Sequence, residues 1–393
     1  MSSKEAPPLR VAMIGYAFMG AAHSHAWRTA PRFFDLPLSP VRHVLCGRDS
    51  AKVVAAAETL GWASTETDWR SAVARDDVDL VDVCTPGNTH AEIAIAALEA
   101  GKHVLCEKPL ANSVAEAEAM AAAAEQAASQ GVRAMVGFTY RRVPAMQLAR
   151  QLIAEGRIGD IRQVRAQYLQ DWLADSSAPL SWRLDKTTAG SGALGDIGAH
   201  IADLVQFLTA QRITGVTAMT ETFVTERPIE TERVGIAGVG GDELGLVTVD
   251  DTAMWLARLS GGAVGTFEAT RYAWGRKNAL RVEISGSEGA IAFDLERLNE
   301  LEYFDASDDP RTGGFRRILV TETSHPYIAA WWPPGHGLGY EHGFTHQVVD
   351  LVTALAAGEQ PEPSFADGLA VQRVLDAVAS SAAAGSTWVD VPG

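Results

Sequence analysis

The first third of the chain alternates short apolar runs with longer polar-apolar segments of helical period. The apolar runs cover residues 9–14, 41–46, 80–84, 103–106 and 134–137. The helical segments cover residues 21–30, 50–60, 90–100 and 113–129. Uniformly apolar strands separated by helices are typical of a parallel sheet covered on both faces. The pattern therefore predicts a doubly wound α/β domain over residues 1–140.

The pattern changes in residues 141–393, which we expect to form a second, α+β domain. Residues 196–208 have one apolar helical face, and residues 344–357 and 367–384 return to helical period near the end. Strand-like alternation covers residues 216–225, 252–259, 263–270, 280–286 and 289–294. Gly-rich turns between these strands predict an open-faced, mostly antiparallel sheet. The acidic, Gly-rich segment 229–246 is interpreted as a loop.

Composition narrows the function classes. The 393 residues carry a net charge of −16 and no stripe of Lys or Arg, which argues against binding nucleic acid or an anionic membrane. We find neither a signal-like N-terminus nor an apolar run long enough to span a bilayer. Three cysteines in apolar stretches indicate no disulfide framework, as expected of a cytoplasmic protein.

A glycine-bearing loop follows the first predicted strand and opens the first helix. It reads Gly15-Tyr-Ala-Phe-Met-Gly20, a dinucleotide-binding fingerprint with Ala17 at the middle glycine position. Such a loop presents helix N-terminal N–H groups to a pyrophosphate. A purely structural strand-to-helix turn is the alternative. We expect Gly15, Ala17, Phe18, Met19 and Gly20 to contact a nucleotide.

The end of the second strand bears on the choice of nucleotide. The fingerprint expects a carboxylate there for the ribose 2′-hydroxyl, but the chain has Gly47 followed by Arg48 and Asp49. An Arg at this place tolerates a 2′-phosphate, so NADP stays open beside the favoured NAD. Asp49 is either a ribose ligand or simply the N-cap of the next helix.

Two further segments carry candidate chemistry. Lys108 follows Glu107 just past the fourth strand, where ligands bind in doubly wound sheets. Asp196, His200 and Asp203 are spaced i, i+4 and i+7, which places them on one helical face. A histidine beside carboxylates suits a general base for an alcohol proton. The alternative is an N-capping Asp196 with a histidine buried for packing.

Together these elements resemble the glucose–fructose oxidoreductase/inositol dehydrogenase/MocA family. The matching segments are residues 15–20, 83–90, 107–109, 137–141 and 195–200, in the family's order. The resemblance implies a Rossmann domain followed by an open-faced sheet. It implies an NAD(P)-dependent oxidoreductase that oxidises a secondary hydroxyl of a sugar, anhydrosugar or cyclic polyol to a ketone. Lys108, Asp196 and His200 would be its catalytic trio.

Residues 16–27 are similar to the branch of this family that holds levoglucosan and other pyranoside dehydrogenases. The departures from the family pattern are Ala17 and Gly47, and the second leaves the preference between NAD and NADP open. Two other functions stay in view. One is an NADPH-dependent keto-sugar reductase, and the other is a nucleotide-sensing regulator without turnover.

The remaining expected contacts follow from position. Cofactor contacts are expected from residues that follow the third and fourth strands, namely Thr85, Pro86, Asn88, His90, Glu107 and Lys108, although His90 also suits a helix start. Substrate contacts are expected from Tyr140, Arg141, Trp172, Arg183, Lys186, His336 and Tyr340. We expect no metal site, because His23 and His25 would point to different helix faces. An open sheet face predicts a homodimer or homotetramer through the C-terminal sheet.

Overall fold

The computed structural model describes residues 6–234 and 237–393 and divides the chain into two compact units. The first unit takes in the chain up to Thr139 together with Tyr340–Leu369, and the second takes in Tyr140–Gly339 with Ala370–Gly393. This division differs from the two continuous domains that the sequence predicted. The physical reason is helix α9 (Tyr340–Ala357), whose Phe344 and Leu351 lie in the same apolar core as Trp27 of helix α1 (Phe18–Phe33).

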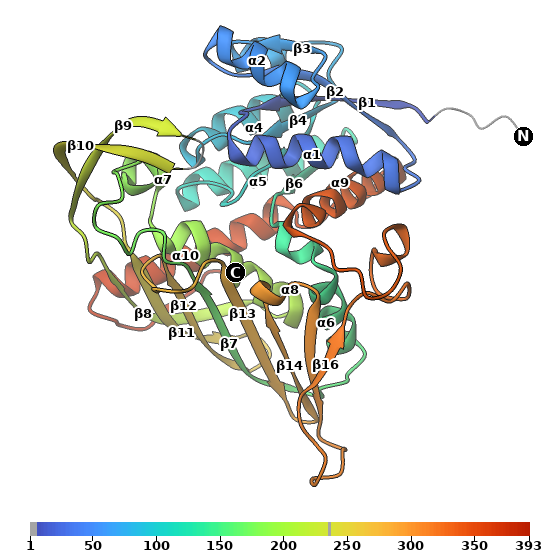
Figure 1. Ribbon diagram of the computed structural model, residues 1–393, viewed down its shortest axis with the longest axis vertical. Helices are drawn as coiled ribbons and strands as arrows, with labels where there is room; N and C mark the ends of the chain where they lie inside the picture. The colour runs from blue at the N-terminus through green and yellow to red at the C-terminus, as the bar shows by residue number, and fades with distance from the viewer. Residues whose placement is uncertain (1–5, 235–236) are drawn as a thin grey trace, which may run out of the picture. The chain divides into compact units, whose positions relative to one another are not determined.

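A six-stranded parallel sheet with the order β3-β2-β1-β4-β5-β6 forms the centre of the first unit (Figure 1). Its strands are β1 (Pro8–Ile14), β2 (Ser39–Cys46), β3 (Ser64–Glu66), β4 (Leu80–Val83), β5 (His103–Cys106) and β6 (Ala134–Val136). The predicted doubly wound sheet is confirmed. The sequence missed β3, because three half-buried residues give no apolar run.

The helices of the first unit follow the strands in turn. They are α1, α2 (Ser50–Leu60), α3 (Trp69–Val73), α4 (His90–Glu99), α5 (Val114–Ala128) and α9. Capping explains where several of them begin. Ser113 accepts the N–H of Glu116 at the start of α5, and Asp68 accepts the N–H of Ser71 at the start of α3.

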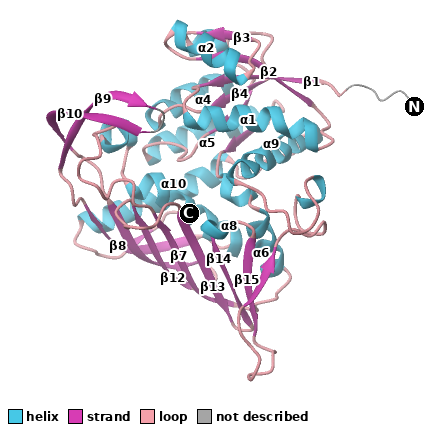
Figure 2. Cartoon of the chain, in the orientation of Figure 1, coloured by secondary structure: helices cyan, strands magenta, loops and turns pink. Residues whose placement is uncertain are grey.

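The second unit is built on a nine-stranded sheet with the order β16-β15-β14-β13-β7-β12-β11-β8-β17 (Figure 2). Its strands are β7 (Ile161–Leu169), β8 (Ile213–Glu221), β11 (Thr252–Leu259), β12 (Val264–Thr270), β13 (Ala279–Gly286), β14 (Gly289–Asp294), β15 (Glu300–Asp305), β16 (Arg316–Leu319) and β17 (Val389–Asp390). All neighbouring strands are antiparallel except β7 and β12. This confirms the predicted fold class.

Helix α8 (Ala199–Thr209) is buried along nearly its whole length and packs on the sheet of the second unit. It follows a single π-helical turn, Leu194–Gly198, which holds Asp196. A π-turn of this kind occurs often at functional sites. The unit also contains helices α6 (Pro144–Ala154) and α7 (Lys186–Ala189), and helix α10 (Phe365–Ala383) enters it from the first unit.

The predicted loop over residues 229–246 is wrong in the residues that the structure describes. They form most of an antiparallel hairpin of β9 (Glu226–Val234) and β10 (Ala237–Leu246). Backbone pairing stabilises this ribbon without a continuous apolar face, and Val239 and Leu244 are exposed on it. Across residues 6–234 and 237–393, no helix has both the length and the apolar character that crossing a membrane requires.

Candidate active site

The glycine loop is a tight strand-to-helix turn that leaves no room for side chains at its two glycines. Gly15 has a φ of +98°, and a Cβ on it would lie 2.5 Å from the carbonyl oxygen of Cys84. A Cβ on Gly20 would lie 2.3 Å from the carbonyl oxygen of Gly15. Ala17 caps helix α1 without a side-chain hydrogen bond, and the first helical turn holds no acidic residue. The uncapped N–H groups and the helix dipole therefore fit the phosphates of a dinucleotide.

Packing explains the missing carboxylate at the end of β2. The ring of Tyr16 covers Gly47 so closely that a Cβ there would lie 2.0 Å from a ring carbon. Asp49 caps helix α2, because its Oδ1 accepts the N–H of Lys52 at 3.0 Å. That hydrogen bond lowers the pKa of Asp49. Asp49 is therefore the N-cap of helix α2. Its neighbour Arg48 is exposed.

His90 joins the loops that follow β4 and β5. Its ring nitrogens lie 2.9 Å from the carbonyl oxygen of Thr85 and 3.0 Å from that of Pro109. Burial lowers the pKa of His90. The residue therefore fixes the two loops expected to meet the cofactor, while Asn88 is exposed in the first of them.

Glu107 belongs to a buried network that the sequence analysis did not find. One carboxylate oxygen lies 2.9 Å from Nε2 of His23, and the other accepts the N–H of Lys108 at 3.1 Å. Nδ1 of His23 lies 3.0 Å from both carboxylate oxygens of Asp82. With only 4% of its surface exposed, Glu107 is held inside the first unit by these contacts. The signal available in the sequence was Asp82, an acidic residue inside an apolar strand, which needs a partner.

Asp196 and the turn before it are fixed by residues that flank strands β11 and β12 of the second unit. Its Oδ2 accepts a 2.9 Å hydrogen bond from the guanidinium of Arg271, which is almost fully buried. The carboxylate of Asp250 accepts the N–H groups of Gly192 and Leu194 at 2.7 and 2.8 Å, just before Asp196. Burial raises the pKa of Asp250, and these backbone bonds oppose that rise. Arg271 lies far from Asp196 in sequence, so local patterns gave no sign of the pair.

His200 lies against two tyrosine rings of the same unit. The centroid of its ring is 4.6 Å from that of Tyr140 and 5.8 Å from that of Tyr168. The two tyrosine hydroxyls are 2.6 Å apart, and that of Tyr168 donates to Oδ1 of Asn278 at 2.7 Å. Because Tyr168 has only one hydroxyl hydrogen, Tyr140 is the donor to Tyr168.

The same hydrogen-bond chain continues to Trp172. Gln170 donates to Oδ1 of Asn278, and the indole N–H of Trp172 donates to Gln170, both at 2.9 Å. The guanidinium of Arg271 lies 5.3 Å from the centre of the Trp172 ring. Trp172 nevertheless has 41% of its surface exposed. The second unit therefore joins an exposed aromatic ring to Tyr140 beside His200.

Arg141 and Asp203 differ from the sequence interpretation. Arg141 was expected at the substrate and Asp203 beside His200, but they form a buried ion pair with bonds of 2.5 and 2.8 Å. Asp203 lies on α8 and Arg141 in the turn after β6, so the pair fixes that turn to the helix within the second unit. Two charges this deeply buried require each other.

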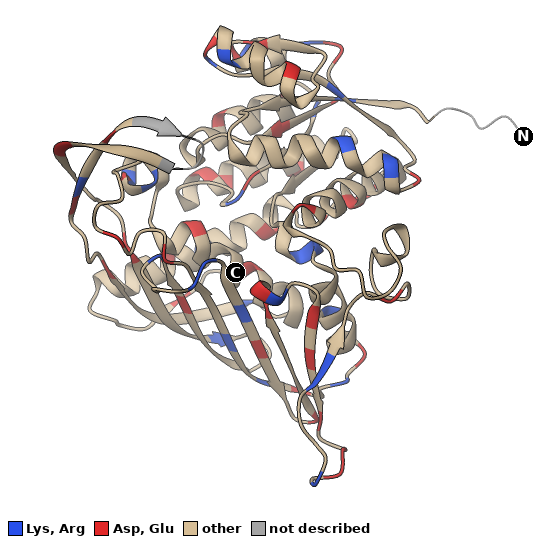
Figure 3. Cartoon of the chain, in the orientation of Figure 1, with Lys and Arg blue, Asp and Glu red and all other residues tan. Residues whose placement is uncertain are grey.

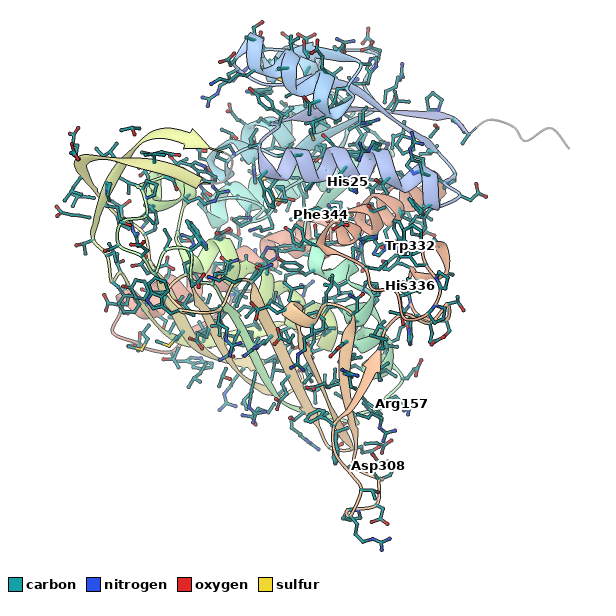
Figure 4. All side chains as sticks on the ribbon, viewed as in Figure 1. His25, Arg157, Asp308, Trp332, His336 and Phe344 are labelled. Carbon is teal, nitrogen blue, oxygen red and sulfur yellow. The ribbon has the colours of Figure 1, made fainter. Side chains whose placement is uncertain are left out.

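The other predicted substrate residues are dispersed. Arg183 stacks on Trp182, its guanidinium 4.5 Å from the ring centre, and Lys186 is exposed at the start of α7. His336 and Trp332 lie in the loop before α9 (Figure 4), where Nδ1 of His336 is 2.9 Å from the carbonyl oxygen of Pro333. Tyr340 belongs to the first unit, where its ring stacks on Phe18 of the glycine loop.

The fold and the glycine loop define a protein with a dinucleotide-binding Rossmann domain. Residues 9–138 match the model of the oxidoreductase family with an NAD-binding Rossmann fold, and residues 146–292 match the Gfo/Idh/MocA C-terminal domain. The chain belongs to the Gfo/Idh/MocA oxidoreductase family. The predicted family, the enzyme class and the nicotinamide cofactor are confirmed.

Several relatives match almost the whole chain. The levoglucosan dehydrogenase of Pseudarthrobacter phenanthrenivorans is 44% identical over 389 residues, or 98% of each chain. A solved levoglucosan dehydrogenase in complex with NADH and levoglucosan has a TM-score of 0.92 and 44% identity, covering 98% of this chain and 100% of that one. An oxidoreductase domain protein from Kribbella flavida has a TM-score of 0.94 and 67% identity, with the same coverage.

Proposed function

We propose that this protein is an NAD-dependent dehydrogenase that oxidises a secondary hydroxyl of an anhydrosugar or related pyranose to a ketone. The observation that carries the substrate class is the exposed Trp172 ring, joined by hydrogen bonds to the tyrosines beside His200. An aromatic ring stacks on the apolar face of a sugar, and the amide and hydroxyl groups behind it fix its orientation. The names of the levoglucosan dehydrogenases among its relatives support the same class.

We assign the catalytic roles to Lys108, Asp196 and His200. A bound NAD supplies the acceptor for the hydride that leaves the carbinol carbon. The hydroxyl proton passes to a ring nitrogen of His200, and the ammonium of Lys108 donates a hydrogen bond to the reacting oxygen. Asp196, held by Arg271, orients the site and adds negative charge that favours a protonated imidazole.

We assign the cofactor site to the glycine loop and to the loops after β4 and β5. Gly15, Gly20 and the start of α1 hold the pyrophosphate, and Tyr16 over Gly47 forms the wall near the adenosine. NAD is favoured over NADP because a levoglucosan dehydrogenase relative of the same fold is solved with NADH. Arg48 is the residue that would reverse this preference, since its exposed guanidinium is free of steric cover.

A binding titration followed by a turnover assay tests the proposal. Tryptophan quenching would be followed with NAD, NADH, NADP and NADPH, and then NADH absorbance with levoglucosan, glucose and myo-inositol. We expect NADH binding and turnover on levoglucosan or another pyranose. Reduction of keto-sugars with NADPH alone would indicate the reductase. NADH binding without turnover on any sugar would favour the nucleotide-sensing regulator.

We further propose that the protein forms a homodimer or homotetramer through the large sheet and works in the cytoplasm. Met219, Met254 and Leu256 are exposed on neighbouring strands β8 and β11. Residues of both charge signs occur along the strands of this sheet (Figure 3). Arg165 and Glu283 form one ion pair on neighbouring strands. Light scattering would test assembly, with Met254→Glu expected to weaken it. The free, buried cysteines support the location, which cell fractionation would test.

A further inference from the structure

The first unit contains a line of charged groups that the proposed chemistry does not use. It runs from Asp82 on β4 through His23 on α1 to Glu107 at the end of β5. Asp82 also accepts the indole N–H of Trp27 at 2.7 Å. His23 and Asp82 are no more than 1% exposed. The line ends at the backbone of Lys108, whose N–H donates to Glu107.

The contacts define the protons of this line. An ionised carboxylate only accepts hydrogen bonds, and each ring nitrogen of His23 faces one. Both nitrogens therefore donate when the imidazole is protonated. Burial is the largest single effect and lowers the pKa of His23, but the charges and hydrogen bonds of Asp82 and Cys84 together outweigh it, so the pKa lies well above its usual value. Asp82, Cys84 and Glu107 are the titratable groups around the ring.

A metal ion is a poorer explanation of the same residues. His23, Asp82 and Cys84 could each offer one ligand atom within 4.8 Å of the others. However, both ring nitrogens lie at hydrogen-bond distance from carboxylates, 2.9–3.0 Å, and Sγ of Cys84 is 3.5 Å from Oδ1 of Asp82. Burial raises the pKa of the Cys84 thiol, which opposes the thiolate that a metal needs.

Glu107 has little freedom to move once His23 holds it. A Cβ on Gly137, after β6, would lie 2.8 Å from Oε1 of Glu107, so the carboxylate occupies the space of a side chain there. Oε1 faces His23, and Oε2 faces the N–H of Lys108. Without the imidazolium, the buried carboxylate would keep its charge uncompensated or move toward water, and either change disturbs the next residue.

We propose that His23 is a positioning residue for Lys108, acting through Glu107 as a buried cation between two carboxylates. The inference rests on the proposed function only where turnover is measured. Asp82 holds His23, His23 holds Glu107, and Glu107 fixes the backbone from which the Lys108 side chain extends. The arrangement ties the catalytic lysine to helix α1, which also presents the N–H groups for the nucleotide.

The test is a double-mutant cycle read in two ways. His23→Gln, Glu107→Gln and the double variant would be compared for turnover with NAD and for hydrogen exchange of the Lys108 amide in the protein without cofactor. We expect His23→Gln to lower kcat on the order of 10- to 100-fold with little change in sugar KM. We expect faster exchange at Lys108. The double variant should lose no more activity than the single variant that loses more, because both changes break the same His23–Glu107 interaction.

Ser24→Ala provides the matched control. Ser24 follows His23 on α1, is buried, and accepts the indole N–H of Trp62 at 2.9 Å. Its loss perturbs the packing of the same helix without touching Glu107. We expect unchanged kcat and unchanged Lys108 exchange in Ser24→Ala. If Ser24→Ala does lower kcat, its fold-loss and that of Glu107→Gln should multiply in the double variant, because the two residues do not interact.

Each outcome decides the inference. Faster Lys108 exchange together with a coupled loss of kcat supports it. Unchanged exchange in a folded His23→Gln protein overturns it, whatever happens to turnover. Faster exchange with normal kcat also overturns it, since the fixed backbone would then not matter to the lysine. Should the wild-type protein oxidise no sugar, the proposed function fails. The exchange cycle, which needs no substrate, then decides whether His23 holds the Lys108 backbone.

Discussion

Two buried histidines, one in each unit, differ in the neighbours that contact their rings. His23 lies between the carboxylates of Asp82 and Glu107, whereas His200 lies against the rings of Tyr140 and Tyr168. Carboxylates on both sides keep two protons on an imidazole, which then acts as a fixed cation. Aromatic rings restrict the plane of an imidazole but supply no carboxylate charge to hold a second proton on it.

The two histidines show that the burial of an imidazole and its protonation state are separate properties. Both rings are at most 9% exposed, so burial alone does not tell a structural histidine from a proton acceptor. The neighbours do. The same reasoning distinguishes Arg141, paired with Asp203, from Arg271, which touches both Asp196 and Trp172. In each case, the partner of the charged group indicates whether it holds the fold or serves the site.

The buried Arg141–Asp203 pair gives the largest expected effect. Asp203→Asn leaves a buried guanidinium without its carboxylate, so we expect the free energy of unfolding to fall by about 3–5 kcal/mol. Urea unfolding would measure the loss. Asp160→Asn is the control, because it breaks the exposed Arg162–Asp160 pair and should change stability by no more than about 0.5 kcal/mol. A normally stable Asp203→Asn protein with abolished turnover would instead give Asp203 a role beside His200.

The catalytic assignment predicts the next largest effect. Lys108→Ala and His200→Ala should each lower turnover at least about 100-fold, because each removes a group that acts on the hydroxyl. The melting temperature should stay close to wild type. The measurement is steady-state NADH formation with the best sugar of the panel. Wild-type turnover in a folded Lys108→Ala protein would remove that residue from the mechanism.

The state of His23 predicts how stability depends on pH. Its pKa is raised in the folded protein, so the stability that it contributes is fully present below its unfolded pKa of about 6.5. That contribution is lost as the pH rises from this value through the folded pKa. The difference in unfolding free energy between wild type and His23→Gln should therefore shrink between pH 6 and alkaline pH. A difference that grows with pH would show that His23 is neutral in the folded protein.

The sequence predicted those parts of the fold in which periodicity and burial agree. Strands β5, β11 and β14 begin and end where the apolar pattern indicated, because each has buried residues on the expected face. The β9–β10 hairpin was missed because its backbone pairs without an apolar face. The packing of α9 in the first unit was missed because its apolar face does not specify which core it joins.

Residues of the site were predictable where they belong to a local motif. The glycine loop needs only Gly15, Gly20 and a following helix, all adjacent in sequence. Arg271 and Asn278 were missed because their partners are brought near only by strand pairing. Asp82 could have been found, since a carboxylate in a fully buried strand must have a partner, although the pattern does not name His23.

Asp49 carries the smallest and last of the expected effects. The carboxylate of Asp49 accepts the N–H of Lys52 at the start of α2. An asparagine keeps an acceptor at this N-cap, so we expect Asp49→Asn to change NADH affinity less than about twofold. Tryptophan quenching measures that affinity. If Asp49 instead binds the ribose, a charge-assisted hydrogen bond is lost and affinity should fall about tenfold or more. Arg48→Ala, tested with NADPH, is the companion variant, and together the two identify which neighbour of Gly47 reads the adenosine ribose.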